Sequence, residues 1–317
     1  MPRTFEVRGA DHRIANGCKA AVSKRWESSL AKGQAVRIEE NRQLVVESHP
    51  PTQPREIQQH GISWEPAREN SLLAARISEL GDWFHNIELN GVWTAPNHFL
   101  GDFPNVKWKH ISNAFPDDLA GASVLDIGCN GGFYSIALKR RGAGRVLGVD
   151  VDDRYLNQAR FAAETLRLEI EFQKASVYEV DRLAGQFDYV LFMGVFYHLR
   201  YPLFALDKVI KKVGGKLIFQ SMMRGSAEEK QWKDNYQFWD MHPFRDPDFP
   251  CMYFIEHSYA DDPTNWWIPN RGAVEAMLRS SGLEIVGHPE SETYVCEPRR
   301  VKRDGAYLLD LELSGTL

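Results

Sequence analysis

The sequence lacks the features that mark several large classes of protein. Its four cysteines, Cys18, Cys129, Cys251 and Cys296, lie far apart without a CxxC pair, which argues against a disulfide framework or a zinc ribbon. No uninterrupted apolar run approaches the length of a membrane span, and the first residues, MPRTFEVRGADHR, contain no apolar core of a secretory signal. We therefore expect a cytoplasmic protein with reduced thiols and no membrane association.

An excess of positive charge is also missing. The 38 lysines and arginines are outnumbered by 43 aspartates and glutamates, and the formal net charge is −5, so the chain as a whole does not attract phosphate backbones. Residues 1–60 and the positions Arg299, Arg300, Lys302 and Arg303 are locally basic and are a faint hint of nucleic-acid binding. Charge runs of this size are typical of solvated surface.

The chain is long enough for one large domain with extensions. Residues 1–70 are polar and predict an accessory segment in which AVRIEE and QLVVES form a hairpin. Residues 71–121 predict a connector that covers the ligand site, with a helix SLLAARISEL capped by Ser71 and an aromatic-rich continuation. Residues 122–298 form the predicted main domain, with an aromatic lid inserted at residues 222–267, and residues 299–317 form a tail.

From Ala122 onward, short apolar runs alternate with amphipathic stretches, as in successive βαβ units. The predicted strands are SVLDIG, RVLGVDV, LEIEFQKA, FDYVLFMG and KLIFQS, and LEIVGH and ETYVCEP form an antiparallel edge. The predicted helices are FYSIALKRR, YLNQARFAAETL, PLFALDKVIKK with Gly214 and Gly215 as its C-cap, and RGAVEAMLRSSG. The pattern predicts an α/β fold: a Rossmann-like, doubly wound, seven-stranded sheet with an antiparallel edge strand.

A glycine-rich loop, VLDIGCNGGFYS, follows the first strand of this domain. Its spacing fails the dinucleotide pattern G-x-G-x-x-G, because Asn130 and Phe133 stand where glycines are needed. A phosphate-binding P-loop is excluded as well, since no GK[ST] follows. The acid Asp126 ahead of the bend suits a ligand that carries a cation or an amine, and free N–H groups of the next helix are expected to point toward it.

A second acid, Asp150, ends the next predicted strand. An acid at this position in a doubly wound sheet accepts hydrogen bonds from ribose hydroxyls. A nucleoside without a phosphate in the loop, but with a positive group nearby, matches S-adenosyl-L-methionine. A loop whose glycines serve only packing is the competing interpretation, which the position of Asp150 disfavours.

Several motifs together resemble the class I S-adenosylmethionine-dependent methyltransferases. They are VLDIGCNGGFYS, GVDVD, FDYVLFMGVFYHLRYP and VGGKLIFQS, and the match covers residues 121–298. ELNGVW, MGVFYHLRYPL and NWWIPNRGAVEAMLRSSGL more narrowly resemble the tRNA wobble-uridine carboxymethyltransferases, which use carboxy-S-adenosylmethionine. The resemblance implies a donor site formed by Asp126, Gly128, Asn130, Gly132, Asp150, Val151, Ser176, Val177, Met193 and Tyr197. Where the family has an acid that contacts adenine, this chain has Ser176, so backbone groups of Ser176 and Val177 are expected to serve.

The carboxymethyltransferases hold the extra carboxylate of their donor with a lysine. Phe84 falls near that position, and no lysine occurs between Lys32 and Lys107. A buried carboxylate without its cation is costly, so we expect methyl transfer from unmodified S-adenosyl-L-methionine.

For catalysis, Tyr197 and His198 are expected at the carboxyl edge of the sheet, where ligands bind. The resemblance places Tyr197 beside the donor, whereas His198 is equally well explained by packing or capping. His242 and His257 in the predicted lid are further acid–base candidates, and its aromatic walls are Trp232, Tyr236, Trp239, Tyr253, Trp266 and Trp267. A metal site from His242, Glu256, His257, Asp261 and Asp262 matches no ligand template, so no metal is expected.

Three functional hypotheses remain. The first is a methyltransferase acting on the oxygen or nitrogen of a small molecule, which the aromatic lid favours over a tRNA. The second is a wobble-uridine methyltransferase or carboxymethyltransferase acting on tRNA. The third is a catalytically silent S-adenosyl-L-methionine-binding module. The sequence leaves homo-oligomerisation open.

Overall fold

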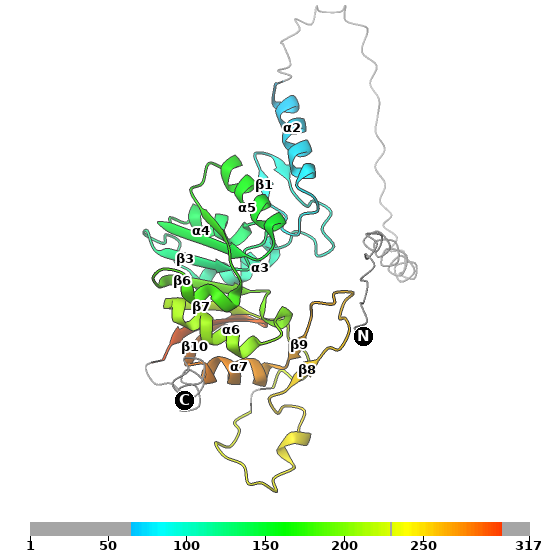
Figure 1. The fold of residues 1–317 in the computed structure, drawn as a ribbon, viewed down its shortest axis with the longest axis vertical. Helices are drawn as coiled ribbons and strands as arrows, with labels where there is room; N and C mark the ends of the chain where they lie inside the picture. The colour runs from blue at the N-terminus through cyan, green and yellow to red at the C-terminus, as the bar shows by residue number, and fades with distance from the viewer. Residues whose placement is uncertain (1–64, 229, 300–317) are drawn as a thin grey trace, which may run out of the picture. The chain divides into compact units, whose positions relative to one another are not determined.

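The computed structural model describes residues 65–228 and 230–299, and within them a seven-stranded sheet in the order β10-β11-β7-β6-β3-β4-β5 (Figure 1). The first strands are β3 (Ser123–Ile127), β4 (Arg145–Asp150), β5 (Glu171–Lys174) and β6 (Phe187–Met193). The others are β7 (Val213–Gln220), β10 (Leu283–Glu290) and β11 (Thr293–Pro298). Only β11 runs antiparallel to its neighbours β7 and β10. The predicted Rossmann-like sheet with an antiparallel pair at one edge is confirmed.

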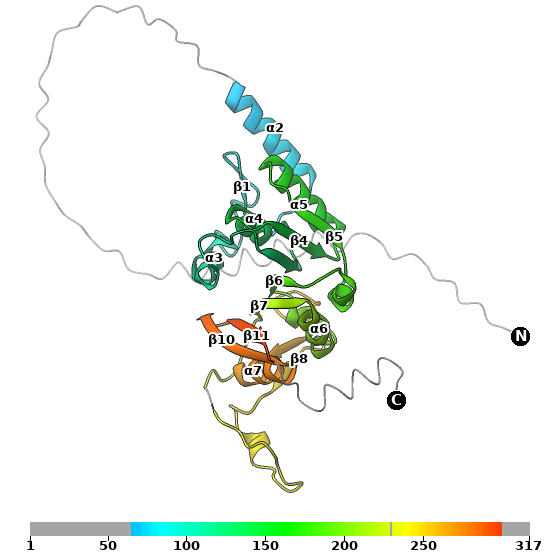
Figure 2. The ribbon, with the colours of Figure 1, turned by 90° about the vertical axis from the view of Figure 1, so that its left-hand side faces the viewer.

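Helices cover both faces of the sheet. The face that packs α3 (Asn105–Ile111), α4 (Phe133–Arg140) and α5 (Asp153–Thr165) is opposite the one that packs α6 (Pro202–Val209) and α7 (Arg271–Ser280). Figure 2 shows α3 and α6 on opposite sides of the strands. The helix α2 (Glu65–Glu79) packs through Ile77 beside Ile136 of α4 and Ala162 of α5.

Alternation along the strands assigns the two cores. Val124, Leu191 and Ile218 face α3 and α4, whereas the adjacent Leu125 and Val190 face α6 and α7. Successive side chains of a strand point to opposite faces, so a strand buried on both faces reads as an apolar run. This is why the short apolar runs of the sequence predict these strands.

Shorter elements complete the described residues. They are the strands β1 (Glu88–Leu89), β2 (Val92–Trp93), β8 (Met252–Phe254) and β9 (Trp267–Pro269). The 3₁₀ turns are η1 (Ser112–Ala114), η2 (Val177–Arg182), η3 (Phe196–His198), η4 (Ile210–Lys212) and η5 (Pro243–Arg245).

Two local predictions are wrong. Ser71 lies inside α2 rather than capping it, because the helix already includes Glu65. Gly214 and Gly215 lie inside β7, and α6 ends through η4 instead. A Cβ on Gly215 would come within 2.4 Å of the carbonyl oxygen of Asp188 on β6. The glycine therefore allows close approach of two strands.

The predicted insertion, residues 222–267, follows β7. Figures 1 and 2 both show its middle part, around η5, projecting past α7 and away from β3 and α4. Trp232 and Tyr236 pack there on Phe249, at ring separations of 5.0 and 5.9 Å, and Trp239 is 83% exposed. The end of the insertion returns to the sheet, where the N–H of Trp266 donates to the carbonyl of Tyr197. Closure of the insertion as a lid stays a prediction.

The predicted hairpin of residues 35–48 and most of the tail lie outside the described residues. So does Cys18, while Cys129, Cys251 and Cys296 carry free thiols. No helix among the described residues is long and apolar enough to cross a membrane.

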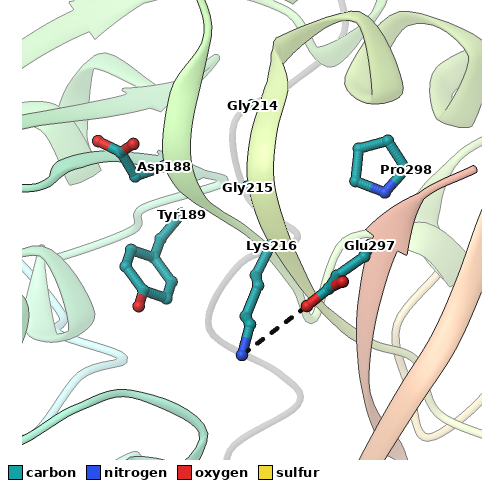
Figure 3. Close-up of a pocket in the computed structure, with 7 residues that line it drawn as sticks. All are labelled: Asp188, Tyr189, Gly214, Gly215, Lys216, Glu297 and Pro298. Atoms are coloured by element: carbon teal, nitrogen blue, oxygen red, sulfur yellow. Dashed lines mark ion pairs between the residues drawn. The ribbon is translucent and has the colours of Figure 1, made fainter.

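A hollow of about 500 Å³ opens where β6 and β7 begin and β11 ends (Figure 3). It is lined by Asp188, Tyr189, Gly214, Gly215, Lys216, Glu297 and Pro298. This is the edge opposite to the carboxyl ends of the parallel strands, and ligands of doubly wound sheets bind at those carboxyl ends.

Candidate functional site

The glycine loop between β3 and α4 depends on the absence of two Cβ atoms. Gly128 has φ +74°, and a Cβ there would lie 2.3 Å from Cγ2 of Val195 in the loop after β6. Gly132 has φ +85°, and a Cβ there would lie 3.1 Å from that of Ala159 on α5. The loop therefore packs closely against the neighbouring elements, an approach that needs glycine, and we call this bend the glycine cradle.

Asn130 stands where the loop needs another left-handed residue, and its φ is +49°. Asparagine tolerates this region better than most residues with a side chain. Its backbone N–H donates to Oδ2 of Asp150 at 3.0 Å, and its side-chain Oδ1 accepts from the N–H of Gly131 at 2.7 Å. The asparagine thus adopts the left-handed backbone that glycine would otherwise supply. Its N–H also links the loop to Asp150 at the end of β4.

Asp150 orders two loops at once. Its Oδ1 accepts from the N–H of Asp152 at 3.0 Å, while its Oδ2 accepts from Asn130. Each carboxylate oxygen has two acceptor sites, so both oxygens can accept a further hydrogen bond. The side chain is partly exposed at the carboxyl end of β4, as recognition of a diol requires.

Asp126 at the end of β3 is 3% exposed, and its Oδ2 accepts from both the N–H and the hydroxyl of Ser135 on α4. The N–H of Phe133 is also occupied, because it donates to Nδ1 of His85 at 3.4 Å. The expectation that the N–H groups at this helix start are free for a ligand is therefore wrong at two positions. Asp126 positions α4 beneath the loop, and its contact with a donor stays a prediction.

Burial raises the pKa of Asp126 from 3.8 to about 6, and the charge of Asp150 acts in the same direction. Between these values the folded protein holds a proton that the unfolded chain has lost, so its stability falls as pH rises through this window. The loss is about 3 kcal/mol. We expect Asp126→Asn, which keeps both hydrogen bonds accepted from Ser135, to lack this pH dependence of stability. Urea unfolding at pH 4 and pH 7, which span most of this window, would show its stability rising relative to wild type by about 2 kcal/mol. A pH-independent difference would contradict the assignment.

The connector places an aromatic cluster over the loop. His85 packs against Gly131, Phe133 and Tyr134, and Phe84 packs on His98 at a ring separation of 4.9 Å. Burial lowers the pKa of His85 to about 3 and also lowers that of His98. The two imidazoles are therefore neutral at pH 7.

Two phenols, Tyr134 at the start of α4 and Tyr197 in η3, lie close enough to interact electrostatically. Burial raises the pKa of Tyr197 to about 12, aided by the charges of Glu292 and Asp262. Burial also raises the pKa of Tyr134, which lies close enough to Asp126, Glu290 and Tyr197 to feel their charges. Neither hydroxyl has a hydrogen-bond partner among the described residues. Both therefore stay protonated at neutral pH and can donate to a ligand.

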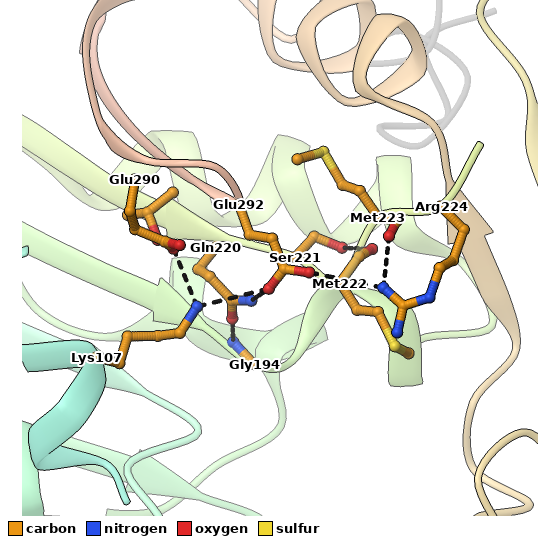
Figure 4. A network of polar contacts seen from close by, with 10 residues as sticks. Lys107, Gly194, Gln220, Ser221, Met222, Met223, Arg224, Glu290 and Glu292 are labelled. Atoms are coloured by element: carbon orange, nitrogen blue, oxygen red, sulfur yellow. Dashed lines mark hydrogen bonds and ion pairs between the residues drawn. The ribbon is translucent and has the colours of Figure 1, made fainter. Parts of the chain in front are cut away.

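A polar network holds Gly194, which follows β6 and precedes Tyr197 by three residues (Figure 4). Gln220 of β7 accepts from the N–H of Gly194 at 2.8 Å and donates to Glu292 at 3.1 Å. Lys107 of α3 lies 3.0 Å from a carboxylate oxygen of Glu290 and 3.5 Å from one of Glu292. The network therefore joins α3, β6, β7 and the β10–β11 turn beside the two phenols.

The three predicted histidines fall in different surroundings. His198 is half-buried, and its Nδ1 lies 2.9 Å from the hydroxyl oxygen of Thr264. His242 and His257 are exposed, and His257 is joined only to Glu256, at 3.9 Å, among the described residues. No group of three His, Cys, Asp or Glu side chains within the described ranges is arranged to hold a metal ion.

The remaining donor-site predictions lie along the same edge. Val151 is exposed after β4, and the hydroxyl of Ser176 accepts from the N–H of Tyr178, which caps η2. Val177 and Met193 are buried, Met193 at the end of β6. Their roles toward a donor stay predictions. Sequence reasoning missed His85, Tyr134 and Thr264, because each acquires its place only through contacts with distant segments.

Residues 124–214 match a family model described as a methyltransferase domain. The chain is 29% identical over 191 residues to a tRNA U34 carboxymethyltransferase of Ectopseudomonas mendocina, covering 57% of this chain and 50% of that protein. It is 34% identical over 137 residues to a ubiquinone biosynthesis O-methyltransferase of Nitrosococcus oceani, covering 42% of this chain and 57% of that protein. The chain thus spans about half the length of the curated relatives it matches.

Among solved structures, the chain is similar to the N-terminal domain of EvdMO1, crystallised in the presence of SAH and D-fucose. The TM-score is 0.53 at 20% identity, covering 73% of this chain and 97% of that one. This likeness concerns the fold.

Proposed function

We propose that this protein, which carries a class I methyltransferase domain, is an S-adenosyl-L-methionine-dependent methyltransferase that acts on an oxygen, or a nitrogen, of a small molecule. The observation that carries the proposal is the hydrogen bond between the glycine loop, at Asn130, and Asp150. It places the glycine cradle beside a partly exposed carboxylate with free acceptor capacity. A nucleoside with a cationic group fits this pair better than a phosphate, which the carboxylates of Asp126 and Asp150 would repel.

When bound, the donor supplies a methyl group on a sulfonium that is already activated toward attack. The chain's contribution is then alignment and exclusion of water. Asp150 accepts the ribose hydroxyls, the glycine cradle receives the methionine part, and the phenols of Tyr134 and Tyr197 orient polar atoms beside the acceptor.

The cluster at Phe84 supports an unmodified donor. Its neighbours are the rings of His98 and Phe103, and both histidines of the cluster are neutral at pH 7. Lys107 of α3 is already paired with Glu290 and Glu292. An additional carboxylate on the donor would find no cation in this cluster, at a high desolvation cost.

The charges beside the phenols favour a small acceptor over tRNA. Lys107 is paired with two glutamates, and Arg224 lies 3.8 Å from Glu292 and donates to the hydroxyl of Tyr259. Both cations face carboxylates, which weakens their attraction for a phosphate backbone. The tRNA alternative is supported by the names of six similar proteins, all tRNA U34 carboxymethyltransferases, whereas two others are ubiquinone biosynthesis O-methyltransferases.

The deciding experiment supplies methyl-labelled S-adenosyl-L-methionine with either a metabolite extract or total tRNA. We expect label in the metabolite fraction. Label in tRNA would contradict the small-molecule acceptor and favour the tRNA alternative. Donor binding without transfer to any fraction would leave only the binding-module hypothesis. Binding of the donor is measured separately by calorimetry.

A further inference from the structure

A chain of hydrogen bonds links His198 to the end of the insertion. The hydroxyl oxygen of Thr264 lies 2.9 Å from Nδ1 of His198 and 2.6 Å from Oδ1 of Asp262. The N–H of Thr264 also donates to Oδ1 of Asp262, at 2.8 Å. His198 immediately follows Tyr197, and their rings are 4.3 Å apart. The relay therefore ends beside the phenol of Tyr197.

The direction of the relay follows from what each group can donate. A carboxylate only accepts hydrogen bonds, so the hydroxyl proton of Thr264 points to Asp262. The hydroxyl oxygen must then accept from Nδ1–H of His198. The neutral imidazole has one N–H group, which here is at Nδ1. Nε2 is therefore unprotonated and can accept a hydrogen bond or a proton. Nε2 has no hydrogen-bond partner among the described residues.

The backbone holds the relay in place. Tyr259 and Asp262 exchange two backbone hydrogen bonds across Ala260 and Asp261, whose φ angles are +54° and +60°. Two consecutive left-handed residues make a tight turn that matches the twist of a hairpin. The side-chain amide of Asn265 donates to the carbonyl of Tyr259 at 2.9 Å, and the N–H of Trp266 donates to the carbonyl of Tyr197. Asp262 and Thr264 are thus fixed relative to His198 from both sides.

We propose that His198 is the general base of methyl transfer to a hydroxyl acceptor, and that Thr264 and Asp262 are positioning residues that keep its Nε2 unprotonated. The inference rests on the proposed function. The acceptor oxygen forms a bond to the methyl carbon while the carbon–sulfur bond breaks and its electron pair stays on sulfur. The proton of the hydroxyl passes to Nε2 and then to solvent.

The ionisation of His198 suits this role. Burial lowers its pKa, and the charge of Asp262 and a hydrogen bond to the backbone of Thr264 oppose that shift. Asp262 and the adjacent Tyr197 are the titratable groups that face the ring. The imidazole is therefore neutral at pH 7, and Asp262→Asn is expected to lower its pKa further.

The tautomer can be measured without any acceptor. Protein labelled with ¹⁵N-histidine is studied by long-range ¹H–¹⁵N spectroscopy at pH 8, with His198→Gln to assign the signal. We expect Nδ1 protonated in wild type and in Thr264→Ser, which keeps the hydroxyl. In Thr264→Val, of nearly equal shape, the proton is expected to move largely to Nε2. An Nε2–H tautomer in wild type, or no change in Thr264→Val, would overturn the relay.

Activity provides the second readout, on the acceptor identified by labelling. Loss of a general base costs about 10² to 10⁴-fold, and we expect that loss in kcat for His198→Gln. Thr264→Val is expected to lose about tenfold in kcat with KM and donor affinity nearly unchanged, and Thr264→Ser to stay close to wild type. Normal kcat in His198→Gln would overturn the base assignment while the methyltransferase proposal survives. An inactive wild type would instead refute the proposed function, and the tautomer result would stand apart from it.

Discussion

Replacement of Asp150 by alanine is expected to weaken binding of S-adenosyl-L-methionine by about 100-fold or more. A hydrogen bond to a charged group contributes about 1.5 to 3 kcal/mol, and two ribose hydroxyls would lose their acceptor. In the variant, the backbone N–H groups of Asn130 and Asp152 lose their hydrogen-bond acceptor. The glycine loop is then no longer hydrogen-bonded to the end of β4. Isothermal titration calorimetry with S-adenosyl-L-methionine measures the effect directly.

The matched control is Asp152→Ala, two residues away at the start of α5. The carboxylate of Asp152 caps α5 by accepting from the N–H of Arg154 at 2.8 Å, so its loss should cost about 1 kcal/mol of stability. Donor affinity should stay within about threefold of wild type, because the side chain has no partner in the glycine loop. Near-normal affinity in Asp150→Ala, with thermal unfolding showing an intact fold, would remove the ribose assignment.

Gly128→Ala is expected to destabilise the protein by about 3 kcal/mol. The left-handed backbone costs about 1 to 2 kcal/mol for a residue with a Cβ. Crowding adds about 1 to 3 kcal/mol, because the new Cβ would come within 2.3 Å of Val195. Urea unfolding measures the total, and donor affinity should fall as well, since the loop must move away from the strand edge.

Gly185 supplies the control for backbone strain. It has the same φ of +74°, but no atom lies within 4 Å of the position of a new Cβ. Gly185→Ala should therefore cost only the conformational part, about 1 kcal/mol. The difference between the two variants isolates the contact with Val195. Equal costs would show that Val195 gives way freely and that the cradle is not closely packed.

Much of the fold could be predicted from local pattern. Strands such as β6 and β7 are buried on both faces and therefore appear as apolar runs, and the helices between them show apolar positions at helical spacing. The errors occurred where tertiary contact overrides local preference. Gly214 and Gly215 resemble a helix cap, yet the approach of β7 to β6 places them in a strand.

The candidate site divides in the same way. Gly128, Gly132 and Asp150 were identified because their spacing along the chain follows from a strand, a turn and a helix, which are local structures. Asn130 departs from the glycine pattern, and its left-handed backbone accounts for the departure.

The sequence by itself determined the sheet, the glycine loop and the acid that faces it, because these depend on residues close together in the chain. Only the tertiary structure brought Thr264 and Asp262 to His198, 66 positions away from Thr264, and Lys107 to Glu290. A side chain whose partner lies that far along the chain carries no local signal of the pairing. The partner is chosen by how the sheet and the insertion pack.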